Sequence, residues 1–171
     1  AANSDPAEPI YLVPAFVGLG APYWDSDARG AIVGMTRDSG QAEIAKAGLE
    51  SVCYQTRDLL EAMASDMSRA GLGRPEALRV DGGMVVNDLF CQWLANLTGR
   101  PIERPRVVET TALGAAYLAG IGTGIYSSLE DVAAAWKCER RFEPSISVDE
   151  RDAKYQGWKE AVGRVLPPAR N

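Results

Sequence analysis

Helical and strand-like segments alternate between residues 41 and 119, and this alternation limits the fold more than any other feature of the sequence. In the first helix, apolar residues recur every three or four positions, and Glu50, Arg57, Asp58 and Glu61 fall on its other, polar side. Such alternation predicts an α/β fold with a small mixed, partly parallel sheet flanked by helices. The five expected segments are a helix from Gln41 to about Ala70, a strand at Ala77–Val80, a helix over about Asn87–Thr98, a strand at Pro101–Arg106 and a helix from Thr110 or Thr111 to Ala119.

Shorter segments flank this central part. Proline and glycine interrupt the strand-like runs near the N-terminus, and a capping box of Ser128 and Asp131 opens a helix further on. The expected flanking elements are a linker or frayed end at residues 1–9, strands at Ile10–Phe16 and Gly30–Thr36, a helix from Ser128 to Trp136, a strand at Cys138–Phe142 and a helix over Asp149–Leu166.

Composition excludes several classes of function. The 171 residues contain no histidine, which removes Ser-His and Cys-His dyads, a histidine general base and the commonest metal ligand. The net charge is −5 and no basic face is present, so we expect no nucleic-acid partner. No apolar run approaches the roughly 18 residues of a membrane helix, so we expect no membrane span.

The cysteines and the N-terminus bear on the compartment. Cys53, Cys91 and Cys138 are odd in number, far apart and set among apolar residues, which predicts buried free thiols in a reducing environment. The N-terminal segment has no apolar core of the kind that signal peptides carry. We therefore expect a cytoplasmic protein.

The segment from Val80 to Asn87 carries the strongest indication of a ligand. A strand ends, Gly82 and Gly83 turn the chain, and a helix follows. Glycine lets the backbone approach a ligand closely, and the N-terminus of a helix attracts phosphate or a polar base edge. The pattern alone leaves open an ordinary turn that needs glycine for its backbone angles. The Rossmann and P-loop fingerprints are both absent from the sequence.

Three other features have a structural interpretation. The small residues over Thr110–Gly120 predict a helix that packs closely on a neighbour without touching a ligand. We assign Asp25 and Asp27 to a turn or helix cap, because no further carboxylate clusters with them. The loop Gly18–Trp24 is expected to pack its aromatic residues against the core.

Taken together, five segments resemble the FGGY carbohydrate kinases, and among them the members that phosphorylate glycerol. The resemblance covers about residues 10–166 and implies the C-terminal domain of a ribonuclease-H-like (actin-like ATPase) fold. The domain would occupy residues 10–171 and be incomplete at its N-terminal side. The matching segments, in family order, are Val13–Trp24, Ala28–Arg37, Leu49–Asp58, Leu78–Gly83 and Thr111–Gly120.

The resemblance also implies where the site residues lie. Family members are about three times as long, and the chain begins with Ala1 rather than methionine, so we expect a further domain upstream. That part would hold the polyol contacts, the aspartate general base and most Mg²⁺ ligands, so no catalytic or metal-binding residue is assigned here. Gly83 and Asn87 would contact ATP or ADP, with Gly82 and Met84 beside them.

The expected function is transfer of the γ-phosphate of ATP to glycerol, giving glycerol 3-phosphate, with this chain inactive alone. Its expected partners are the N-terminal kinase domain, glycerol and further copies of itself in a homo-oligomer. Two alternatives remain: an FGGY kinase for a ketose, a sugar acid or another polyol, and a non-catalytic nucleotide-binding or interaction module. If upstream strands are missing, the strand near residues 77–81 should form an unpaired sheet edge.

Overall fold

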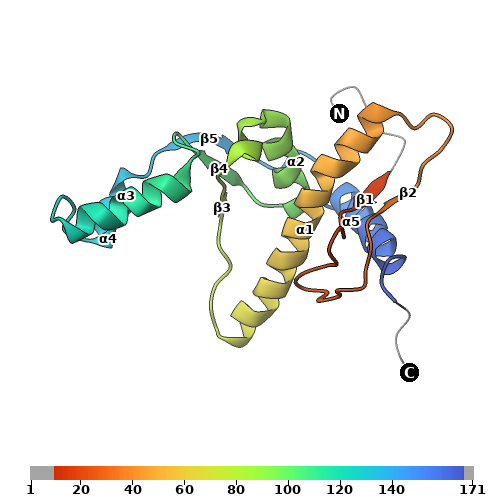
Figure 1. The fold of residues 1–171 in the computed structure, drawn as a ribbon, viewed down its shortest axis with the longest axis horizontal. Coiled ribbons are helices and arrows are strands. Elements are labelled where there is room, and N and C mark those ends of the chain that lie inside the picture. The colour runs from red at the N-terminus through yellow and green to blue at the C-terminus, as the bar shows by residue number, and fades with distance from the viewer. Residues whose placement is uncertain (1–9, 168–171) are drawn as a thin grey trace. The chain divides into compact units, whose positions relative to one another are not determined.

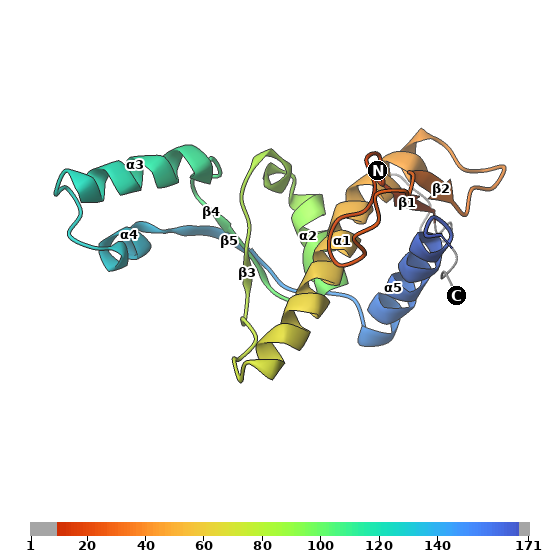
Figure 2. The ribbon, with the colours of Figure 1, turned by 60° about the horizontal axis from the view of Figure 1, so that its bottom comes forward.

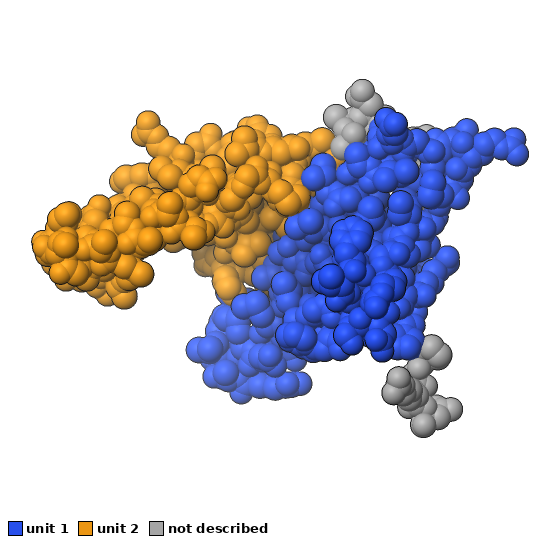
Figure 3. All heavy atoms as spheres, viewed as in Figure 1, with its two compact units in different colours: residues 1–74, 96–99, 145–171 blue, residues 75–95, 100–144 orange. Residues whose placement is uncertain are grey.

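The computed structural model describes residues 10–167, which divide into two compact units (Figures 1 and 3). The expected linker at residues 1–9 lies outside the described residues. Unit 1 comprises residues up to 74, residues 96–99 and residues from 145 onward, and unit 2 comprises residues 75–95 and 100–144.

Unit 1 places two long helices beside a short antiparallel ribbon. Strand β1 (Tyr11–Val13) pairs with β2 (Ala31–Val33), and helices α1 (Gln41–Arg69) and α5 (Val148–Gly163) both contact β1. Both strands are shorter than predicted, since pairing stops before Pro14 and before Gly34, whose φ is +89°. In the core, the ring of Tyr54 stacks on Trp158 with centroids 5.3 Å apart.

Helix α1 has the predicted bounds, but its polar side is not a solvated face. The carboxylate of Glu43 accepts a hydrogen bond from the Gly40 N–H at 2.9 Å and so caps the first turn. Arg57 and Asp58, expected on the polar side, are both buried, and partners from distant segments hold them. The sequence pattern identified this helix correctly and placed these two residues wrongly.

Unit 2 is built on a mixed three-stranded sheet, as predicted. Strand β3 (Leu78–Arg79) runs parallel to β4 (Ile102–Pro105), and β5 (Cys138–Phe142) pairs antiparallel with β4. Helix α2 (Asp88–Thr98) follows β3 and leads to β4. β3 forms one edge of this sheet, in agreement with the expected unpaired edge. Its self-association stays a prediction.

Helices α3 (Thr110–Gly122) and α4 (Leu129–Ala135) lie side by side beyond one end of this sheet (Figures 1 and 2). The expected close packing of the small-residue helix is wrong for α3, whose only buried residue is Gly120. The ring of Tyr126 occupies the place where a Cβ of Gly120 would stand. Most of α3 is exposed, including Leu118 at 67%. The capping interaction at α4 agrees with the prediction, since Ser128 Oγ accepts from the Asp131 N–H.

Two expectations about exposed residues also need correction. Cys53 and Cys91 are buried thiols outside any disulfide, as predicted, but Cys138 is exposed because it begins an edge strand with four exposed residues. In the Gly18–Trp24 loop, Leu19 is buried, whereas Trp24 is 79% exposed. Asp25 serves the turn, as predicted, since its Oδ1 accepts from the Asp27 and Ala28 N–H groups. Within residues 10–167, no helix is long and apolar enough to cross a bilayer.

Candidate functional site

The turn between β3 and α2 brings together all four residues that the sequence singled out. Gly82 and Gly83 follow the strand, Gly83–Val86 forms a single 3₁₀ turn, and Asn87 immediately precedes α2. Gly82 has φ +87° and ψ 176°, a conformation that essentially only glycine adopts, and its N–H donates to the Val108 carbonyl at 2.9 Å. The backbone conformation therefore explains why residue 82 is a glycine.

Gly83 has no such explanation within the fold. Its φ lies outside the left-handed region, and a Cβ built on it would meet no atom within 4 Å. Gly83 and Met84 are both exposed. A side chain at residue 83 would fit the fold, so its absence leaves open space above the turn that a ligand can enter.

The two polar atoms of the Asn87 side chain have different surroundings. Its Oδ1 accepts hydrogen bonds from the N–H groups of Leu89 at 3.0 Å and Phe90 at 3.3 Å, which caps α2. Among the described residues, its Nδ2 amide has no hydrogen-bond partner, and the residue is exposed. The capping oxygen fixes the rotamer, so the amide is held ready to donate to a ligand.

Arg104 on β4 holds this turn in place. One of its terminal nitrogens, Nη1, donates to the Val85 carbonyl and to Asp88 Oδ1, each at 2.8 Å, and Nε donates to Glu139 at 2.8 Å. Arg104 is only 9% exposed. The hydrogen bond with Glu139, followed by that with Asp88, raises the pKa of the guanidinium further above its usual range. The arginine thus joins the sheet to both the 3₁₀ turn and the start of α2.

Sequence reasoning missed Arg104, although a signal was present. Ile102 is fully buried, and residues two apart in a strand share a face. A charged residue at 104 is therefore on the buried face, where it needs partners. The partners, however, come from three separate segments, which the pattern of a short strand does not reveal.

Because Asp88 forms an ion pair, the free energy of unfolding of the chain should depend on pH in the acidic range. The hydrogen bond from Arg104, followed by the charges of Arg140 and Arg104, lowers the pKa of Asp88. Because the pKa of Asp88 is lower in the folded chain than in the unfolded chain, its ionised carboxylate stabilises the fold at pH values above the unfolded pKa of about 3.9. This stabilisation is lost as the pH falls through the folded pKa. We expect Asp88→Asn to flatten the pH dependence of the unfolding free energy below about pH 4, measured by urea titration at a series of pH values. In an Arg104→Met background, Asp88→Asn should flatten it far less, and an equal effect in both backgrounds would contradict the assignment.

Comparison with known proteins identifies the family of the chain and agrees with the fold. Residues 1–123 match the FGGY family of carbohydrate kinases, C-terminal domain, so the chain belongs to this family. The structure is similar to a Plasmodium falciparum glycerol kinase crystallised with ADP, with a TM-score of 0.80 and 36% identity over 94% of this chain and 31% of that one. The fold is therefore an α/β, actin-like kinase domain.

Within the FGGY carbohydrate kinases, the sequences most similar to this chain among those compared are glycerol kinases. Glycerol kinase of Alcanivorax borkumensis is 58% identical over 161 residues, and glycerol kinase 1 of Pseudomonas aeruginosa is 56% identical over 160. Each match covers 94% of this chain, but only 32% and 31% of those relatives. The chain thus matches the C-terminal part of these relatives and spans about a third of their length.

Proposed function

We propose that this chain binds ATP and ADP at the Gly82–Asn87 turn and forms the nucleotide-binding part of an enzyme that phosphorylates glycerol. The observation that carries the proposal is the open space at Gly83 beside Asn87, whose side chain caps α2, in a chain similar to glycerol kinases over nearly all its length. The similar Plasmodium falciparum kinase was crystallised with ADP, which supports a nucleotide as the ligand.

Each residue of the turn has a part in this proposal. The backbone at Gly83 approaches the nucleotide where no Cβ intervenes, and the Asn87 amide donates a hydrogen bond near the adenosine end. Gly82 and Met84 border the same space. Phosphoryl transfer depends mainly on positioning and charge neutralisation, so holding the nucleotide rigidly is this chain's contribution.

The remaining parts of the reaction belong to a larger assembly. We expect Mg²⁺ to arrive with the nucleotide and to take its protein ligands from the N-terminal domain. That domain would also supply the aspartate base and the glycerol contacts. We further propose a cytoplasmic homo-oligomer.

The substitution Asn87→Asp separates the two tasks of this residue. Aspartate caps a helix as well as asparagine, so the free energy of unfolding should stay unchanged. Its carboxylate cannot donate the hydrogen bond and repels an anionic nucleotide. We expect KM for ATP in the whole kinase to rise by about tenfold or more, equivalent to about 1.4 kcal/mol. A KM equal to wild type would contradict the role of the amide.

A matched pair at the two glycines supplies the control. Gly83→Val should leave folding intact, because the position is open, and should lower ADP affinity in calorimetry. Gly82→Val should instead lower stability, because a side chain at this φ and ψ costs about 1–3 kcal/mol. Equal affinity for ADP in Gly83→Val and wild type would exclude a ligand above this turn.

Substrate choice is tested on the whole kinase. Purified enzyme should phosphorylate glycerol in preference to xylulose, ribulose and erythritol, and a preference for one of the others would favour the alternative FGGY activity. The 171-residue chain alone should bind ADP weakly and show no turnover. Turnover of glycerol by this chain alone would overthrow the division of roles, and tight ADP binding would favour an independent nucleotide-binding module.

A further inference from the structure

The loop that joins β1 to β2 exposes three large apolar side chains. Phe16 is 76% exposed, Val17 92% and Trp24 79%, and we call these three residues the loop patch. The loop runs beside α1 (Figures 1 and 2), where the Tyr23 hydroxyl donates to Asp58 at 3.0 Å. One aromatic ring of the loop is therefore anchored, while its neighbour Trp24 faces solvent.

The backbone of this loop is fixed, so the exposed side chains are held in place. Leu19 and Asp25 exchange backbone hydrogen bonds at 2.6 and 2.9 Å. Gly18 packs so tightly on this pair that a Cβ would lie 2.5 Å from the Asp25 carbonyl oxygen. Trp24 has φ +52°, a left-handed conformation that is strained for a bulky residue. Strain of this kind is found mainly at functional sites, since the contacts around it must maintain it.

The three exposed side chains adjoin one contact of the loop backbone. Val17 precedes Gly18 and Trp24 precedes Asp25, and Gly18 lies directly against Asp25. Phe16 is next to Val17 in the chain. A single exposed apolar residue is ordinary on a protein surface, but adjoining ones of this size mark an interaction site.

The area of the loop patch limits what can cover it. Because an aromatic side chain buries about 150–250 Å², the exposed fractions of these three residues correspond to roughly 400 Å². A stable complex of two separate chains needs about 800 Å² from each partner, which is about twice the area of the loop patch. Two domains of one chain bury only about 600–1,500 Å² in total, to which one side can contribute about 400 Å². The area therefore favours a domain of the same chain over a second copy.

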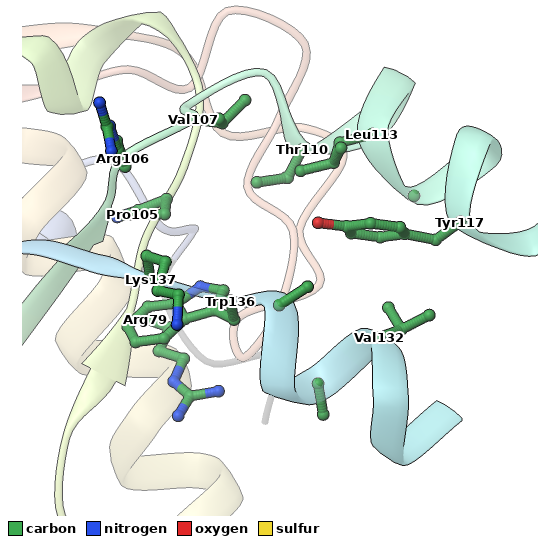
Figure 4. A pocket seen from close by; sticks show the side chains of 13 residues that line it. Arg79, Pro105, Arg106, Val107, Thr110, Leu113, Tyr117, Val132, Trp136 and Lys137 are labelled. Atoms are coloured by element: carbon green, nitrogen blue, oxygen red, sulfur yellow. The ribbon is translucent and has the colours of Figure 1, made fainter. Parts of the chain in front are cut away.

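The cavity in unit 2 lacks such a defined surface. Tyr117 of α3 faces Val132 of α4 across a volume of about 360 Å³ (Figure 4). Beside it, Arg106 and Lys137 point in different directions on either side of Pro105, so they do not form one anion site (Figure 4). The loop patch is therefore the stronger indication of a partner.

We propose that the N-terminal domain of the same kinase chain covers the loop patch. This inference rests on the proposed function, in which that domain precedes residue 1. The relatives leave room for such a domain, because this chain covers only 32% and 31% of them. The described part of unit 1 begins at the buried Ile10, and β1, which spans about 10 Å, leads from there to the loop. A domain joined upstream is therefore within reach of the loop patch, and we expect its facing surface to be apolar.

Photo-crosslinking in the whole kinase identifies what covers the loop patch. Trp24→p-benzoylphenylalanine places a photoreactive aromatic ketone at the exposed position. On irradiation, its carbonyl carbon bonds to a carbon atom in contact, whose hydrogen moves to the ketone oxygen. We expect the cross-linked product to keep the mass of a single chain on denaturing gels, and peptide mass spectrometry should place its other end upstream of residue 1. A product with the mass of two chains, or another end within residues 10–167, would overturn the proposal.

Two further variants complete the test. Val17→p-benzoylphenylalanine should give the same upstream cross-link, and the absence of a cross-link from both positions in folded kinase would also overturn the proposal. Ala153→p-benzoylphenylalanine is the control, since residue 153 is exposed on α5 between Asp152 and Lys154. An upstream cross-link of equal yield from residue 153 would contradict a contact specific to the loop. The cross-link requires neither nucleotide nor glycerol, so its outcome is separate from that of the proposed function, which the glycerol phosphorylation of each variant measures.

Discussion

Replacing Asp58 by alanine is expected to lower the free energy of unfolding by about 4 kcal/mol, since loss of one partner from a buried polar network costs roughly 3–5 kcal/mol. Asp58 is 3% exposed and accepts three hydrogen bonds. The donors are the Tyr23 hydroxyl at 3.0 Å, the Tyr155 hydroxyl at 2.5 Å and Trp158 Nε1 at 2.8 Å. Alanine would leave all three without their acceptor, and two of the donors are 97 and 100 residues away in sequence.

The surroundings of Tyr23 and Tyr155 favour the protonated hydroxyl, which is the form that can donate a hydrogen bond to Asp58. Burial, together with the charge of and hydrogen bond to Asp58, raises the pKa of both Tyr23 and Tyr155 above the ordinary tyrosine value. Both hydroxyls therefore remain protonated throughout the neutral pH range. The interaction ties the Gly18–Trp24 loop and α5 to α1, and the neighbouring ion pair of Arg57 with Asp152, at 2.8 Å, joins the same two helices.

Two substitutions control for this prediction. Asp58→Asn keeps the shape and one acceptor oxygen for Tyr23 and Trp158, while its amide can donate to Tyr155, so its loss should be clearly smaller than that of alanine. Asp66→Ala removes an exposed carboxylate from the same helix and should change little. Urea denaturation monitored by tryptophan fluorescence gives all three values. Equal losses for Asp58→Ala and Asp66→Ala would show that the buried network adds no stability.

The sequence predicted the elements whose signals are local. The bounds of α1 follow from a repeat of apolar residues over many turns and from Gly71, which has φ +69° just beyond its end. The bounds of β5 are Cys138–Phe142, as expected. The four residues of the candidate site lie within six positions of one another, so chain continuity alone brings them together.

The remaining features depend on contacts between distant segments. Asp58 looked like part of a polar helix face, and only its partners in the Gly18–Trp24 loop and α5 explain why it is buried. Arg104 is buried on a strand because Val85, Asp88 and Glu139 surround it. Helical periodicity describes one element at a time and therefore cannot identify these partners. Helix α3 shows a related limit of sequence patterns. Its small residues would allow a neighbouring element to pack closely, but they do not determine whether such an element is present, and α3 is largely exposed.

Arg104→Ala is expected to have the second large effect, a loss of about 3 kcal/mol in the free energy of unfolding, within the range for breaking buried charged hydrogen bonds. The substitution leaves the Val85 carbonyl with the weaker Cys91 thiol donor, 3.2 Å away, and leaves Asp88 and Glu139 without this guanidinium. Because the same contacts fix the 3₁₀ turn that carries Gly83, ADP affinity should fall as well. Thermal or urea denaturation measures the first effect, and calorimetry measures the second.

Arg141→Ala is the matched control, because Arg141 on β5 also forms two ion pairs, with Glu103 and Glu143, each at 2.6 Å, but is exposed. Exposed ion pairs contribute little, so its loss in stability should be much smaller and ADP affinity should be unchanged. Arg104→Lys keeps the charge but cannot reach three acceptors with a planar fork, so it should recover only part of each effect. If Arg104→Ala lowered stability while ADP affinity stayed at the wild-type value, Arg104 would support the sheet without positioning the turn. If both fell together and lysine restored both in part, the turn would owe its binding geometry to a residue on the neighbouring strand.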